Sequence, residues 1–119
     1  MEDKNKKYDL EDRTYKFAKN VAIYCKKLPK NSTNFKYIDQ VIRASSSVGA
    51  NYIEANEALS KKDFVMRAKI CRKEAKESAY WLRLIVDTNA DEFRKEGLSL
   101  KNEAEELKKI FSAIIDKST

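Results

Sequence analysis

Histidine is absent from this chain of 119 residues, and glycine, proline and cysteine are scarce, with two, one and two copies. Without histidine there is no Ser-His-Asp triad, no Cys-His pair and no metal site that uses an imidazole ligand. Two glycines and one proline are too few for the many tight turns of a β-sandwich or barrel, and for a Gly-rich phosphate loop. These absences favour a helical protein and argue against those classes of enzyme.

Long apolar runs are also missing. No stretch approaches the ~18–20 residues that a membrane span needs, and the charged segment 1–12 lacks the apolar core of a secretion signal. Cys25 and Cys71 are fewer than the disulfide framework of a small secreted domain would need. We therefore expect a cytoplasmic protein with no membrane association. Both cysteines fall on apolar helical faces, which favours buried thiols over reactive ones.

What the chain does have is helical periodicity. Apolar residues recur every three or four positions in four segments, at about residues 10–28, 34–58, 61–88 and 100–116. Asp9 is a predicted N-cap, and Pro29 ends the first segment. Ser60 and Asp63 form an S-x-x-D capping signature for the third segment. Gly97 predicts a helix stop before the last segment.

Four amphipathic helices with short connections predict an all-α fold, an antiparallel up-down four-helix bundle that occupies residues 1–119 as a single domain. No strand-like alternation competes with this interpretation. Segment 91–96 is expected to form one or two turns, and Ser99 to cap the last helix. The ends, at 1–8 and 117–119, are expected to fray.

The third segment carries more apolar surface than one bundle core requires. Besides the core positions, four apolar residues occupy a second side: Met66, Ile70, Trp81 and Leu84. One interpretation is a broad core in which Trp81 reaches sideways over the fourth helix. The other, which we favour, is that this side is a candidate oligomer interface and packs against another subunit.

The second segment has an unusual polar side without lysine, formed by Gln40, Arg43, Ser47, Asn51 and Glu54. This side is either a solvated face or a polar seam, to which Glu74 and Glu77 of the third segment would also belong. Three carboxylates, those of Glu54, Glu74 and Glu77, could meet as a cation site. Structural hydrogen bonds or a charge network with Arg43 and Lys73 are the favoured interpretation.

The formal charge of +6 is concentrated in two parts of the chain. Residues 61–83 hold eight basic and three acidic side chains, and residues 1–30 hold nine and five. The basic residues of the third segment form one stripe, on which Tyr80 also lies: Lys62, Lys69, Arg72, Lys73, Lys76 and Arg83. Such a stripe is often only a solvated helix face, but it could also follow the phosphate backbone of a nucleic acid.

No arrangement of residues predicts catalysis. The Glu-x-x-His partners of a di-iron bundle site are absent, and no nucleophile lies beside a base at a recognisable spacing. We expect no catalytic residue, no metal and no cofactor, and hence a protein that is not an enzyme.

Two sequence strings resemble those of a known family. G-A-N-x-x-E-A spans residues 49–55, and K-E-x-x-E-x-x-Y-W-L spans residues 73–82. Together they closely resemble the bacterial four helix bundle protein family, which includes proteins encoded in intervening sequences of 23S ribosomal RNA genes. The accessory protein of diversity-generating retroelements is more distantly similar. The resemblance extends, more weakly, from about Asp9 to Ile115.

The resemblance implies antiparallel four-helix bundles that assemble as ring-like pentamers and have no enzymatic activity. The retroelement relative binds nucleic acid and a reverse transcriptase through basic surface. Seven residues of this chain match family motif positions: Arg43, Ser47, Asn51, Glu54, Asp63, Glu74 and Glu77. The match itself does not decide whether they serve packing or binding.

Two alternative functions follow as expectations. The first is a homo-oligomer, with a homopentamer as the implied assembly, that binds RNA or DNA through the basic stripe. The alternative is an adaptor that binds a protein partner and makes no direct contact with nucleic acid. Its working surface would be the apolar second side of the third helix.

Overall fold

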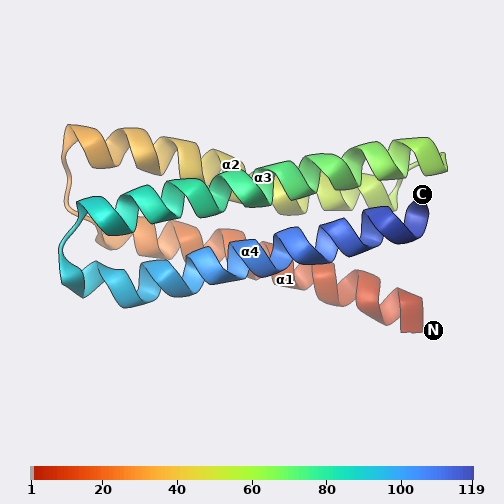
Figure 1. The fold of residues 1–119 in the computed structure, drawn as a ribbon, viewed down its shortest axis with the longest axis horizontal. Coiled ribbons are helices and arrows are strands. Elements are labelled where there is room, and N and C mark those ends of the chain that lie inside the picture. Colours follow the sequence, from red (N-terminus) through yellow and green to blue (C-terminus); the bar gives the residue numbers. More distant parts are fainter. Residues whose placement is uncertain (1) are drawn as a thin grey trace.

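Four α-helices run alternately up and down in the computed structural model, which describes the backbone of residues 2–119 and the side chains from Asp9 onward (Figure 1). They are α1 (Glu2–Lys27), α2 (Ser32–Asn56), α3 (Lys61–Thr88) and α4 (Arg94–Ser118), with a short 3₁₀ turn, η1 (Asp91–Phe93), before α4. No strand forms within residues 2–119. The predicted all-α fold, an antiparallel four-helix bundle, is confirmed.

The described helices form a ring of neighbours. α2 packs between α1 and α3, and α4 packs between α3 and α1. The bundle measures 45 × 23 × 19 Å. Its long axis matches the ~42 Å that the 28 residues of α3 span at about 1.5 Å per residue. None of the described helices is both long and apolar enough to cross a membrane.

The core follows the predicted periodicity. Fully buried apolar side chains come from all four described helices, and the largest include Tyr24 and Phe17 of α1, Leu82 of α3 and Phe111 of α4. Tyr24 follows Phe17 by seven residues, or two helical turns, and therefore shares the buried face of α1.

Both cysteines are free and buried, as expected from their positions on apolar faces. Burial raises the pKa of each thiol, Cys25 and Cys71, to about 12. The Cys71 thiol also donates a hydrogen bond to the Val48 carbonyl oxygen over 3.3 Å. At neutral pH both groups are therefore protonated and weakly nucleophilic.

Side-chain caps begin two of the helices. The Ser60 hydroxyl accepts a hydrogen bond from the Asp63 backbone N–H at 3.1 Å, which confirms the predicted cap of α3. At the start of α2 the side chain of Asn31 accepts from the Asn34 N–H at 2.8 Å. Each cap satisfies one of the four backbone donors that the first turn of a helix leaves without a partner.

A pair of amide side chains ties two connections together at one end of the bundle. Asn34 is buried, and its side chain exchanges hydrogen bonds with that of Asn89 at 2.9 and 3.0 Å. The Asn34 amide also donates to the Pro29 carbonyl oxygen, and the Asn89 amide to that of Ile85. The α1–α2 connection is therefore linked to the end of α3.

The predicted start of the first helix is wrong. α1 begins at Glu2, so Asp9 lies inside the helix and caps nothing. Helical backbone through a charged segment needs no apolar face, and periodicity alone could not reveal it. We also expected residues 1–8 to fray, but Met1 and the side chains of residues 2–8 lie outside the described part of the chain. At the other end, where residues 117–119 were expected to fray, α4 continues to Ser118.

The predicted helix stop at Gly97 is also wrong. α4 begins at Arg94, not at residue 100, and contains Gly97 in its first turns. A Cβ at this position would overlap the Tyr24 hydroxyl and a methyl group of Val86. The glycine therefore permits close contact of α4 with α1 and α3, and does not end a helix. Ser99 is correspondingly an exposed residue within α4 and no cap.

Candidate nucleic-acid interface

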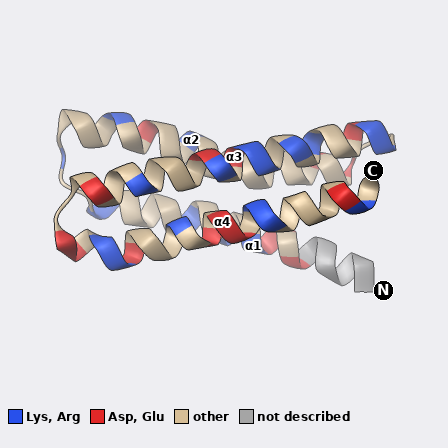
Figure 2. Cartoon of the chain, viewed as in Figure 1, with Lys and Arg blue, Asp and Glu red and all other residues tan. Residues whose placement is uncertain are grey.

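The predicted basic stripe lies along α3, and Figure 2 shows basic positions recurring over most of that helix. Most of its side chains are exposed, and Arg72 is half-buried: the exposed members are Lys62, Lys69, Lys73, Lys76 and Arg83. Steps of three, four and seven residues keep them on one side of an α-helix. The structure thus confirms that the stripe is on the surface.

The central lysines of the stripe make no close ion pair with the side chains that the structure describes. Among the side chains from Asp9 onward, no carboxylate lies within 4.0 Å of Lys69, Lys73 or Lys76. Arg83 makes a long contact to Asp87, at 4.0 Å. The positive charge of α3 is therefore available to an external anion.

An aromatic cluster borders the stripe. Tyr80 is 59% exposed, and its ring meets that of Trp81 at 5.2 Å between centroids and an interplanar angle of 77°. Trp81 is half-buried and packs in turn beside Tyr37 of α2, 6.0 Å away. The exposed ring of Tyr80 thus contacts one partly buried ring, that of Trp81, which in turn packs beside Tyr37.

The apolar second side of α3 is only partly covered. Met66 is 50% exposed, whereas Ile70, Trp81 and Leu84 are half-buried. The ring neighbours of Trp81 are Tyr37 and Tyr80, so it faces α2, whereas the broad-core interpretation placed it over the fourth helix. The four predicted interface residues therefore differ in exposure, and Met66 is the most exposed of them.

Part of the predicted polar seam forms between α2 and α3. The Asn51 side chain donates to the Ser47 carbonyl oxygen at 2.9 Å and accepts from the Arg67 guanidinium at 3.0 Å. Burial raises the pKa of Glu74, with a further contribution from the charge of Glu77. A side-chain hydrogen bond with Ser47 acts in the opposite direction. These contacts stabilise the packing of two neighbouring helices.

The remaining seam residues do not join this network. Arg43 pairs with Asp39 on the exposed surface of α2, at 3.3 Å, and makes no network with the carboxylates of α3. Glu54 is exposed and Gln40 is half-buried. Within the described part of the chain, no three carboxylate or thiol side chains gather closely enough to share a metal ion.

Arg67 is a seam residue that the sequence interpretation missed. It precedes Glu74 by seven residues, and this spacing places both on the same side of α3. The signal was therefore present, but its partner Asn51 lies on another helix, so the contact depends on how α2 and α3 pack.

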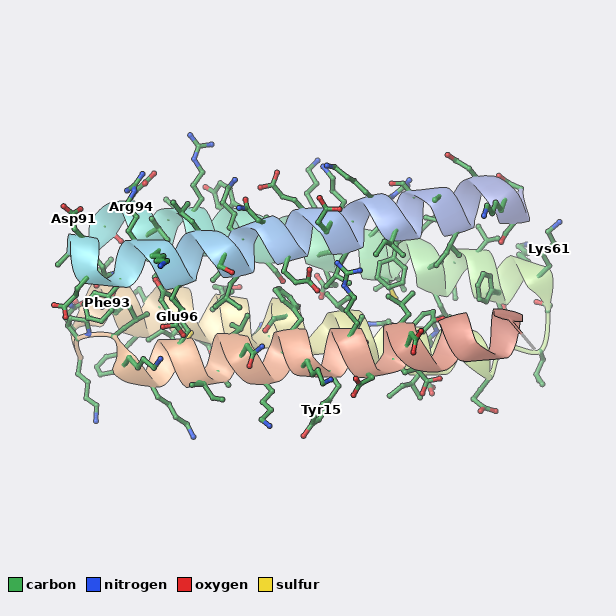
Figure 3. All side chains as sticks on the ribbon, turned by 90° about the horizontal axis from the view of Figure 1, so that it is seen from below. Tyr15, Lys61, Asp91, Phe93, Arg94 and Glu96 are labelled. Carbon is green, nitrogen blue, oxygen red and sulfur yellow. The ribbon has the colours of Figure 1, made fainter. Side chains whose placement is uncertain are left out.

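A second feature without a sequence signal is the junction between α1 and α4. Arg13 binds Glu103 through two hydrogen bonds, at 2.7 and 2.8 Å, and this hydrogen bonding raises the pKa of the guanidinium. At one end of this junction Lys27 binds Glu96 at 3.0 Å, and Figure 3 shows Glu96 directed from α4 toward α1. An open groove of about 760 Å³ lies at the other end, where Leu10, Phe64 and Ile114 are among its lining residues.

The comparison with known families decides the relationship of this chain. The family described as 23S rRNA-intervening sequence protein matches residues 6–113. The chain belongs to this family. The resemblance carried by the two sequence strings is thereby confirmed, although a family of this description does not specify an activity.

A solved structure supports the same family and fold. A protein of unknown function from the S23 ribosomal protein family of Bacteroides thetaiotaomicron is 32% identical, with a TM-score of 0.82. The similarity covers 93% of this chain and 98% of that one, so the two are alike over their whole bundles. No curated protein sequence shows significant similarity to the chain.

Proposed function

We propose that this protein is a non-enzymatic, homo-oligomeric helical bundle that binds RNA or DNA through contacts to phosphates, and that it works in the cytoplasm. The observation that supports it most is the row of exposed lysines on α3, Lys69, Lys73 and Lys76, without a carboxylate within 4.0 Å among the described side chains. Cations that the protein leaves unpaired displace counterions from a nucleic acid, which favours binding.

The charge distribution supports phosphate contacts over contacts to bases. Residues 61–83 carry a local excess of five positive charges, from eight basic and three acidic side chains. Lysine on a regular helix face approaches phosphates as a point charge and distinguishes sequences poorly. We therefore expect affinity that depends on salt much more than on sequence.

Assembly forms the second part of the proposal. Met66 is half-exposed beside the partly covered Ile70, and this apolar surface suits contact with another copy of the chain. A ring of copies, with five as the number that the family resemblance implies, would add several basic stripes into one positive field. Light scattering measures this directly: a stable pentamer supports the proposal, and a monomer of 13.8 kDa contradicts it.

A salt titration tests the nucleic-acid part. A labelled single-stranded RNA is bound at increasing salt by the wild type and by a triple variant, Lys69→Gln, Lys73→Gln and Lys76→Gln. Log affinity falls with log salt, and each lost phosphate contact makes this decline less steep by about 0.7. The triple change should therefore reduce the steepness by about 2.

The control is a second triple variant with the same loss of charge on other helices: Lys19→Gln, Lys26→Gln and Lys95→Gln, all exposed positions. It should keep most of the slope. Equal effects of the two triple variants would mean that the stripe is no binding site and that only net charge matters. Absence of binding at low salt would exclude the proposed function.

The alternative is an adaptor that binds a protein partner, and the half-exposed Met66 is the observation that favours it. Met66 lies one turn from Lys62 and Lys69, so the test uses a neutral change. If the protein is such an adaptor, Met66→Gln should abolish partner binding, whereas the triple lysine variant should leave it intact. The two functions are thus distinguished by whether Met66 or the lysines tolerate substitution.

A further inference from the structure

Tyr80 occupies an unusual position among the exposed aromatic residues. It lies on the basic stripe of α3, four residues after Lys76 and three residues before Arg83. On an α-helix such neighbours have Cβ atoms ~5–6 Å apart, so the ring lies near two cations, with Glu77 as the one acidic neighbour at this spacing. With 59% of its surface exposed, the ring offers an open apolar face on the basic stripe.

The contacts of Tyr80 restrict its movement. Trp81 meets the tyrosine ring at 5.2 Å and 77°, and is itself packed beside Tyr37 at 6.0 Å. Both supporting rings are half-buried and pack against the core. A ring that is already oriented loses less conformational entropy when a ligand stacks on it.

Tyr15, the other highly exposed tyrosine among the described side chains, shows how specific this setting is. Tyr15 is 65% exposed and projects from α1 into solvent, as Figure 3 shows. The charged residues three or four positions from Tyr15 are Glu11, Asp12 and Lys19, so it lacks the excess of positive charge around Tyr80. No ring contact to Tyr15 occurs among the described side chains. It therefore serves as a matched control.

We propose that Tyr80 is a stacking platform for an unpaired base, with Lys76 and Arg83 on the adjacent phosphates, so that the protein selects single-stranded over double-stranded nucleic acid. Base faces are accessible to an aromatic ring in single strands but are covered by neighbouring bases in a duplex. This inference rests on the proposed nucleic-acid function and specifies the class of nucleic acid that the stripe binds.

The chain contains one tryptophan, Trp81, and this residue reports on the site directly. A single-stranded 12-mer of uridine should change the fluorescence of Trp81 on binding, because the stacked base lies next to the Tyr80–Trp81 pair. A blunt duplex of the same length, titrated at the same salt, should bind more weakly and leave the fluorescence nearly unchanged.

Substitution of Tyr80 tests the stacking contact. Tyr80→Ala should weaken binding of the labelled 12-mer about fivefold or more, the loss expected for one aromatic–base stack. Tyr80→Phe should retain the affinity, and Tyr15→Ala should have no effect. Tyr80→Leu keeps an apolar side chain against Trp81 but has no aromatic face, so it should fold normally and still lose affinity.

An abasic 12-mer with the same phosphates separates stacking from charge. It should bind the wild type no better than the uridine 12-mer binds Tyr80→Ala, and Tyr80→Ala should cause no further loss. If Tyr80→Ala and Tyr80→Leu bind the uridine 12-mer like the wild type while the triple lysine variant does not, the stacking inference is wrong and the proposed function stands. If neither the 12-mer nor the duplex binds, both are wrong.

Discussion

Two basic residues of α1 and the central lysines of the α3 stripe have opposite roles in the structure. On α1, Arg13 and Lys27 are paired with carboxylates of α4, at 2.7 and 3.0 Å. On α3, the exposed Lys69 and Lys76 have no such partner among the described side chains. Positive charge on α1 thus stabilises the α1–α4 junction, whereas positive charge on α3 faces outward. Composition alone therefore cannot assign a role to the excess charge.

We therefore expect substitutions in these two places to have different effects on stability and on binding. Changes at the α1–α4 junction and in the core should alter the free energy of unfolding and leave binding by the folded protein intact. Changes on the α3 stripe should do the reverse. Four experiments test this separation of effects, and their expected effects on stability decrease from the first to the last.

High pH should have the largest effect, through one buried thiol in α1 and one in α3. The folded thiols of Cys25 and Cys71 keep their protons up to a pKa of about 12, against an ordinary value of 9.0. Above pH 9 the unfolded chain therefore binds fewer protons than the folded one, and stability falls as pH rises. Between about pH 10 and 11.5 each thiol should lower the free energy of unfolding by about 1.4 kcal/mol per pH unit.

Urea unfolding at a series of pH values measures this decline. The double variant Cys25→Ala and Cys71→Ala, less stable at pH 8, should show a flatter profile above pH 9. The decline that remains above pH 10 should come from the buried Tyr24, because burial also raises the pKa of its hydroxyl to about 12. A profile as steep as that of the wild type would show that other groups cause the alkaline loss. The two single variants would then compare the α1 and α3 sides directly.

Gly97→Val should have the next largest effect. Even a Cβ at this position overlaps Tyr24 and Val86, so the larger side chain forces α4 away from its neighbours. Overpacking of this kind lowers the free energy of unfolding by about 3 kcal/mol. Urea unfolding measures the loss, and nucleic-acid binding by the remaining folded protein should be unchanged.

The matched control is Ser99→Val, at an exposed position of the same helix, which should change stability by less than about 1 kcal/mol. If Gly97→Val were as mild as this control, the close approach of α4 to Tyr24 would not be a feature of the protein in solution. If it abolished binding in the folded fraction, the separation between junction and stripe would fail.

Removal of the Arg13–Glu103 ion pair should have a smaller effect. Arg13 is 42% exposed in its side chain and Glu103 30%, so solvent screens the pair. A double-mutant cycle with Arg13→Gln and Glu103→Gln should give a coupling energy of about 0.5–1 kcal/mol, favoured within that range by the two-bond geometry. The exposed Lys16–Asp12 pair, at 67% and 59%, is the control and should give less. A coupling of zero would show that charge does not hold the α1–α4 junction.

The triple lysine variant of the stripe should have the smallest effect on stability. Lys69→Gln, Lys73→Gln and Lys76→Gln remove exposed charges that have no described carboxylate partner, so unfolding should shift by less than about 0.5 kcal/mol. Relief of repulsion between like charges one turn apart should, if anything, stabilise α3 slightly. A large loss of stability would mean that these lysines support the bundle and would weaken their assignment to an external ligand.

Much of the fold could be read from local signals. The Ser60 cap and the core periodicity follow from residues within one or two turns of each other, and the structure confirms them. Gly97 shows where that approach fails. A glycine after a loop commonly stops a helix, but here it accommodates Tyr24, a residue more than seventy positions earlier in the chain. Only tertiary packing reveals this reason.

The candidate site was predictable to a similar extent. Spacing placed the lysines and Tyr80 on one face, because that depends only on the geometry of α3. It could not show that Arg43 would pair with Asp39, or that Arg67 would reach Asn51, because both outcomes depend on side-chain choices between competing partners. Nor could it place Trp81 beside Tyr37, since α2 supplies the second ring.

The order of the helices around the bundle has a consequence for the time course of folding. Three of the four neighbouring pairs are joined by short connections, whereas α1 and α4 meet only after the whole chain has been folded back. Closing that longest loop carries the largest entropic penalty, so we expect α1 to dock onto α4 last. We therefore expect the α1–α4 junction, with its open groove and exposed ion pairs, to form last on folding and to separate first on unfolding.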